Sequence, residues 1–153
     1  MPKKPTAMDA QLILHLYDLR REAEMRKARN WWGGEFFPQS VDELMAVAST
    51  FGSQENNWFR QVAGYWNMAA SFVLLGVLNE DLFLQPACSG EMFLIFAKVH
   101  PFLKEWRAKV GDPHLFLNIE KVVTHTKWGR DRLQFMLKRV EIMRQKRKAA
   151  SSS

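Results

Sequence analysis

The sequence predicts an all-α protein, a single-domain bundle of five to seven helices around a buried central helix. Three observations support this fold class. Residues 61–79 contain no charged residue, apolar residues elsewhere recur at helical spacing, and no stretch shows the sustained alternation of a half-buried strand. A helix that is apolar on every side must be covered by its neighbours. The other helices are therefore expected to surround this segment.

The composition indicates a protein with one hydrophobic core. It also indicates that the protein lies in a reducing compartment. The chain has 153 residues, of which 47% are hydrophobic, and that length lets one domain bury about two thirds of its unfolded surface. Cys88 is the only cysteine, so no intramolecular disulfide can form, and no signal-peptide pattern is present. We therefore expect a cytoplasmic protein.

The uncharged middle segment must also be considered as a membrane span. Its 19 residues would form about 28 Å of helix, close to the thickness of a bilayer. Gln61, Asn67 and Asn79 divide the segment, however, and leave residues 68–78 as the longest apolar run. A run of that length is typical of a buried core helix, so a membrane partner is disfavoured.

The first half of the chain carries clear helix-start signals. Residues 1–5 are expected to be a disordered basic arm, and a helical domain is expected over residues 6–143. Thr6 can cap a first helix that ends before Gly33 and Gly34. A capping-box pattern at residues 40–43 starts the next helix, and Ser53 can cap the central one.

Four aromatic residues surround the glycine pair at positions 33 and 34. They are Trp31, Trp32, Phe36 and Phe37. Large aromatic rings contribute most when they are buried, so we favour a segment that folds back over the core. An exposed aromatic interface for a ligand or partner is the alternative.

The second half is expected to hold a single turn at residues 82–84, which Pro86 stops, and then three helices. Residues 89–91 open the first of them, and Pro101 predicts a kink or break at His100 because an interior proline removes a backbone hydrogen bond. Gly111 ends this helix and residues 112–113 start a shorter one. The last helix is expected to lose its apolar stripe and fray over a basic tail, residues 144–153.

Three stretches of the sequence together suggest a family. They are LYDLRREAEMRKARNWW from Leu16, NNWFRQVAGYWNMAASFVLLGVLNEDLF from Asn56 and MFLIFAKVHPFLKEWR from Met92. This combination resembles a bacterial family of small all-helical proteins, of soil-bacterial type, known as a domain of unknown function. The resemblance implies an all-helical fold and supplies no catalytic residues.

The sequence lacks the usual patterns of catalytic and metal sites. None of His15, His100, His114 and His125 follows a glutamate by three positions, as a di-iron bundle requires, and no H-E-x-x-H motif is present. No nucleophile elbow or phosphate-binding glycine loop occurs. No cofactor is expected, and the sequence favours a non-catalytic protein over an enzyme.

Positive charge collects at the C-terminal end of the chain. Residues 127–148 contain nine Lys or Arg against two acidic residues, whereas the whole chain has a net charge of +6. A strip of this kind can bind phosphates, lie on an anionic membrane surface or simply keep the helix soluble. The candidate polyanion contacts are Lys138, Arg139, Arg144, Lys146, Arg147 and Lys148.

Three functional hypotheses follow from these patterns. The first is a helical interaction module that binds a protein partner or associates with itself. The second is a polyanion binder, with nucleic acid as the partner, that uses the C-terminal strip. The third is a small-ligand binder or enzyme with a pocket near Trp66, Asn67 and His100, where polar groups lie among bulky aromatics.

Overall fold

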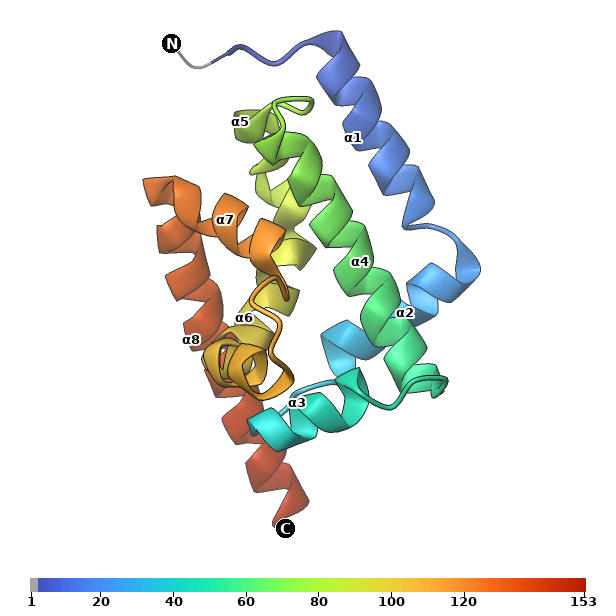
Figure 1. The fold of residues 1–153 in the computed structure, drawn as a ribbon, viewed down its shortest axis with the longest axis vertical. Coiled ribbons are helices and arrows are strands. Elements are labelled where there is room, and N and C mark those ends of the chain that lie inside the picture. Colours follow the sequence, from blue (N-terminus) through green and yellow to red (C-terminus); the bar gives the residue numbers. More distant parts are fainter. Residues whose placement is uncertain (1–2) are drawn as a thin grey trace.

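The computed structural model describes residues 3–153, which form eight helices and no strand (Figure 1). The all-α class is confirmed, with eight helices where the sequence predicted five to seven. The helices are α1 (Ala7–Leu19), α2 (Ala23–Gly34), α3 (Val41–Ala48), α4 (Gln54–Leu74), α5 (Glu80–Phe83), α6 (Pro86–Val110), α7 (Leu117–His125) and α8 (Lys127–Ser151).

Helix α4 is the central helix of the bundle. It packs against α2 on one side and α7 on another, while α8 lies against α6 and α7 and α3 bridges α4 and α6. Helix α1 runs along the outside of the bundle (Figure 1). Side chains from every helix except α1 supply most of the buried core, to which α1 adds Leu16.

The first predicted helix is two helices in the structure. Thr6 forms the capping box with Asp9 that starts α1, but α1 ends at Leu19. The Glu22 carboxylate accepts hydrogen bonds from the backbone amides of Glu24 and Met25, and these bonds start α2. The chain turns at this break, so α2 carries its tryptophans into the core while α1 stays at the periphery.

Helix α4 is shorter and less covered than expected. It ends at Leu74 because Gly76 adopts a left-handed conformation (φ 75°) and the following amides bond back to Phe72. Met68 and Leu75 are exposed, so one side of the central helix faces outward. The expectation that every face is covered is therefore wrong for this side.

Helix α6 continues through Pro101 with helical backbone angles, so of the kink or break predicted at His100 the break does not occur. Pro101 lies on the exposed side of the helix, where its ring does not disturb core packing. The non-helical residue is Ser89 (φ −134°, ψ 15°), one turn after Pro86 at the helix start. Residues 86–89 therefore add a first turn to the helix that the sequence placed from residue 89 onward.

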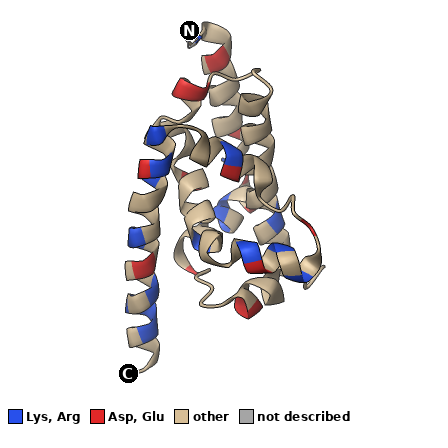
Figure 2. Cartoon of the chain, turned by 60° about the vertical axis from the view of Figure 1, so that its left-hand side comes forward, with Lys and Arg blue, Asp and Glu red and all other residues tan. Residues whose placement is uncertain are grey.

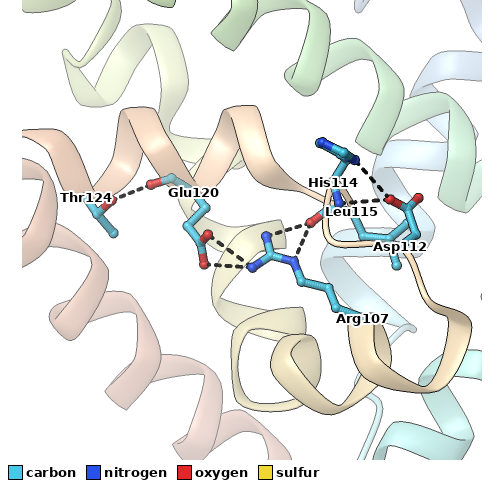
Figure 3. A network of polar contacts seen from close by, with 6 residues as sticks. All are labelled: Arg107, Asp112, His114, Leu115, Glu120 and Thr124. Atoms are coloured by element: carbon cyan, nitrogen blue, oxygen red, sulfur yellow. Dashed lines mark hydrogen bonds and ion pairs between the residues drawn. The ribbon is translucent and has the colours of Figure 1, made fainter.

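A polar network holds the connection between α6 and α7 (Figure 3). Arg107 donates to the Leu115 carbonyl from Nε (3.0 Å) and Nη2 (2.7 Å) and pairs with Glu120 through Nη1 (3.1 Å). Gly111 ends α6 in a left-handed conformation as predicted, but α7 begins only at Leu117, after Phe116 at φ 57°. This arrangement fixes the loop and leaves His114 exposed.

The junction between α7 and α8 depends on a close approach at Gly129. Thr126 caps α8 by accepting from the Gly129 amide (2.9 Å). A Cβ at position 129 would collide with the Val123 carbonyl oxygen, which belongs to the backbone and cannot move aside easily. This junction therefore requires glycine.

Replacing Gly129 with alanine is expected to lower the free energy of unfolding by about 1.5 kcal/mol, the cost of overpacking a tight site. Gly64→Ala is the matched control, because nothing lies within 4 Å of the added Cβ in the middle of α4. That variant should gain about 0.5 kcal/mol from helix propensity. Urea denaturation followed by circular dichroism measures the free energy of unfolding of both variants. Equal values for Gly129→Ala and Gly64→Ala would contradict the close approach at Gly129.

At both ends of the chain, described residues lie in contacts or helix where the sequence predicted disorder. Residues 1 and 2 of the expected arm lie outside the described residues, and the Lys3 carbonyl accepts from the Asn79 side chain. At the other end, α8 continues to Ser151, so the frayed tail expected over residues 144–153 is helical almost throughout. The contacts of Arg144 and Arg147 explain this difference.

Candidate functional site

The four aromatic residues around the glycine pair fold onto the core, as favoured from the sequence, rather than forming the alternative, an exposed aromatic interface. Trp31, Trp32 and Phe36 are buried, with Trp32 stacked on Phe59 at 4.9 Å and Trp31 stacked on Phe36 at 4.5 Å between ring centroids. Phe37 is partly exposed, but cationic side chains lie over its ring. The segment therefore offers no exposed aromatic platform.

Lys98 is a buried cation beside this aromatic segment. Its side chain is fully buried, its Nζ donates to the Trp32 carbonyl and it lies 3.7 Å from the Phe37 ring centroid. Burial, with help from Arg147 and Arg144, lowers the pKa of Lys98 from 10.5 to about 7. The Lys98 amine thus supplies a hydrogen bond to the Trp32 carbonyl, which lies in the last turn of α2 and has no partner within the helix.

The predicted polyanion strip is divided by the fold. Arg144 is buried and donates to the carbonyls of Pro38 (3.0 Å) and Lys98 (2.6 Å). Arg147 donates to the Gly34 carbonyl (2.7 Å) and to that of Glu35. These two side chains fasten α8 to the α2–α3 connection. The remaining four, Lys138, Arg139, Lys146 and Lys148, are exposed.

The outward side of α8 also carries large apolar side chains. Trp128, Phe135 and Ile142 follow one another at intervals of seven residues and are 44%, 46% and 56% exposed. Figure 2 shows Lys and Arg along the length of this helix, with few acidic positions. We call these three side chains, with the flanking cations, the α8 face. The flanking cations are Arg132, Lys138, Arg139 and Lys146.

Cations hold the central aromatic ring of the α8 face. The Arg132 and Arg139 guanidinium carbons lie 5.0 and 5.7 Å from the Phe135 ring centroid. The sequence reasoning missed the apolar part of this face, because it followed the inward stripe that contains Leu133 and Val140. The seven-residue spacing was the signal that could have revealed it.

The three residues of the predicted pocket do not line one site. Trp66 borders a cavity of about 260 Å³ between α1, α4 and the start of α6, but Asn67 and His100 do not line it. His100 is partly buried with its ring against Phe96, and burial lowers its pKa. Asn67 lies partly exposed on α4. Of the three residues, only Trp66 therefore lines this cavity.

Trp66 is anchored by a carboxylate at the edge of this cavity. Its indole Nε1 donates to Glu91 Oε1 (2.9 Å), and Arg29 Nε donates to the other oxygen of the same carboxylate (2.6 Å). Tyr65 donates its hydroxyl to the Leu16 carbonyl (2.6 Å), which ties α1 to α4. Burial raises the pKa of Tyr65 to about 12.

A second cavity, of about 400 Å³, lies near the start of α5 and is lined by acidic side chains and a histidine. Asp9 accepts from Thr6 and from the Asn79 amide, and these bonds lower its pKa. Glu80 pairs with His125 Nδ1 at 2.9 Å. Within residues 3–153, no group of three or more His, Cys, Asp or Glu side chains is placed to hold a metal ion.

Among the same described residues, no helix has both the length and the apolar character needed to cross a membrane. Comparison with curated proteins gave no match, and comparison with solved structures gave none either. A family model described as a domain of unknown function (DUF4760) matches residues 5–128. The matched region covers α1 to α7 and stops at the second residue of α8. The chain therefore belongs to the DUF4760 family.

Proposed function

We propose that this protein is a non-catalytic helical interaction module that binds an acidic amphipathic helix of a partner protein along the α8 face. The observation that carries this proposal is the row of exposed side chains Trp128, Phe135 and Ile142 at seven-residue intervals, with cations on its flanks. With a single cysteine and no disulfide to form, the cytoplasm is the proposed compartment.

The spacing of the apolar side chains favours a helical partner. Side chains that recur every seven residues stay on one side of a helix and can insert between the side chains of a second helix. A helix that lies in a membrane surface needs a broad apolar face instead. The exposed apolar side chains of α8 form only a narrow row, because the other apolar side chains of this helix are buried against α6 and α7.

The charges beside the row favour an acidic partner over a second copy of the chain. Four cations flank the row, whereas its acidic neighbours are Asp131, which pairs with Lys127 at 2.6 Å, and Glu141, which pairs with the buried Arg144 at 3.5 Å. Two α8 faces in contact would bring Lys138 and Arg139 of one copy close to those of the other, and like charges oppose association. A partner with glutamates beside its apolar row would be attracted instead.

Two designed helical peptides test this proposal by fluorescence anisotropy. One has leucines at the seam positions of about four heptads and glutamates beside them, and the other has glutamines in place of the glutamates. The acidic peptide is expected to bind, with an affinity that falls as salt rises. Phe135→Ala and Ile142→Ala should each weaken binding about tenfold, since apolar anchors dominate interface energies.

Phe51→Ala is the matched control, because Phe51 is 75% exposed and lies on the α3–α4 connection. It should leave binding unchanged. The proposal would be contradicted if the glutamine peptide bound as tightly as the acidic peptide, or if Ile142→Ala did not weaken binding. A dimer in light scattering that Ile142→Glu disrupts would instead identify a second copy as the occupant.

Polyanion binding is the second candidate function, supported by the exposed side chains of Lys138, Arg139, Lys146 and Lys148. A short DNA duplex serves as its probe. Salt-sensitive DNA binding that Ile142→Ala does not change, but that Lys138→Gln and Lys146→Gln weaken, would favour this candidate over a helical partner.

A further inference from the structure

The cavity beside Trp66 lies under the break between α1 and α2. It measures about 260 Å³ and its wall is mostly apolar, with Ile13, Leu14 and Leu16 from α1 and the rings of Tyr65 and Trp66 from α4. This volume is at the small end of ligand pockets in proteins. An apolar wall of this kind fits a hydrocarbon chain or an aromatic ring.

One charged side chain in this wall lacks a counter-ion. Arg20 is 7% exposed, and its guanidinium carbon lies 5.2 Å from the ring centroids of Tyr17 and of Trp66. Its buried Nε has no hydrogen-bond partner among the described residues. A buried charge without a partner is costly and is normally paired.

The nearby carboxylate is already bonded to other side chains. Glu91 is the acidic group next to Trp66, and its two oxygens accept from the Trp66 indole and from Arg29. The cluster thus contains two guanidinium groups and one carboxylate. Cys88 also lines the cavity, and burial raises the pKa of its thiol, so it adds no negative charge near neutral pH. The described side chains of this cluster therefore carry a net positive charge.

We infer that the cavity binds a small organic carboxylate, with its charged end on the Arg20 guanidinium and its apolar chain or ring against Leu16, Tyr65 and Trp66. Arginine suits this role because its planar fork can donate two parallel hydrogen bonds to a carboxylate. The Tyr65 hydroxyl is already bonded to Leu16. Arg20 is therefore the residue that selects the charge of the ligand.

Binding at this site should also hold α1 in place. Helix α1 lies on the outside of the bundle (Figure 1) and supplies one wall of the cavity, whereas the opposite wall belongs to α4. A ligand between the two walls adds contacts that exist only in the folded state, so it stabilises that state. Amide hydrogen exchange in residues 7–19 should slow when the ligand binds.

Calorimetric titration with octanoate and with 3-phenylpropanoate tests the inference, since the two probes carry the same charge on a chain or a ring. At least one is expected to bind with one-to-one stoichiometry. Octan-1-ol or 3-phenylpropan-1-ol, which have the same apolar parts without the charge, should bind about tenfold more weakly or not at all. Arg20→Gln should remove that preference for the acid.

Arg21→Gln is the matched control, because Arg21 is the exposed neighbour of Arg20 on the same turn. It should bind as the unaltered protein does. If Arg20→Gln fails to fold by circular dichroism, Ala87→Trp replaces it as the test, because Ala87 is exposed and lines the cavity. The larger side chain should narrow the cavity and weaken binding.

Three results would overturn the inference. The first is that neither acid binds at millimolar concentration. The second is that an alcohol binds as tightly as its acid, and the third is that a folded Arg20→Gln variant, or Ala87→Trp in its place, keeps full affinity. None of these results bears on the α8 face, which lies on a different helix.

Discussion

Replacing Trp32 with alanine is expected to lower the free energy of unfolding by about 3–5 kcal/mol, the range for large aromatic truncations in cores. Trp32 is 1% exposed, and its ring stacks on Phe59 and meets the edge of Phe36 at 5.1 Å. Truncation would leave a cavity where α2 packs on α4. A loss of this size is a large part of the stability of an ordinary domain.

Trp128→Ala is the matched control for this experiment. Trp128 is 44% exposed on the α8 face, so its truncation should change the stability by less than about 1 kcal/mol. Trp32→Phe keeps most of the volume and removes an indole N–H that has no partner, so it should cost less than about 1.5 kcal/mol. Urea denaturation followed by circular dichroism gives all three values. Similar losses for Trp32→Ala and Trp128→Ala would contradict the buried position of Trp32.

Raising the pH from 7 to 9 is expected to increase the free energy of unfolding by about 2 kcal/mol, because of Lys98. Its pKa is about 7 in the folded protein and 10.5 in its ordinary environment. Between these values the unfolded chain binds a proton that the folded protein does not, so stability rises with pH. Below pH 7 both states hold the proton, and Lys98 adds no further pH dependence.

The charged groups that face Lys98 come from α8. They are Arg144 and Arg147, and both favour the neutral amine. Other shifted groups act mainly outside this window: burial lowers the pKa of His100 below 6.5 and raises that of Tyr65 to about 12. Burial also raises the pKa of Cys88, whose contribution begins near the upper end of the window and opposes the rise. The rise between pH 7 and 9 therefore reports chiefly on Lys98.

Lys98→Met should abolish most of this rise, since it fills the same space without a titrating group. Lys104→Met changes an exposed lysine of the same helix and should keep the rise. Urea midpoints at several pH values between 7 and 9 provide the measurement. A flat profile in the unaltered protein, or an unchanged rise in Lys98→Met, would show that the buried amine keeps its ordinary pKa.

Four of the eight helix starts could be predicted from the sequence because they depend on contacts within one turn. Thr6, Ser40, Ser53 and Asn79 each accept a backbone amide three positions ahead, so the pattern and the contact lie in the same few residues. The end of α6 at Gly111 is equally local, since glycine adopts the left-handed conformation at little cost.

The break between α1 and α2 at residues 20–22 could not be predicted from local contacts. Glu22 and Arg26 have the spacing of an intrahelical ion pair, which predicts a continuous helix. In the structure the Glu22 carboxylate caps α2 instead, and Arg20 turns inward over the Trp66 ring. That position depends on Trp66 in α4, which lies 46 residues further along the chain.

The sequence by itself determined that this is an all-helical protein, where four of its eight helices start, and that its positive charge collects on the last helix. Only the tertiary structure decided which of those charges are free. Arg144 bonds to carbonyls 106 and 46 positions away in the chain, while Lys146 faces outward. A long cationic side chain has the same local pattern in both cases, and its role depends on whether distant backbone oxygens fold to within hydrogen-bond reach.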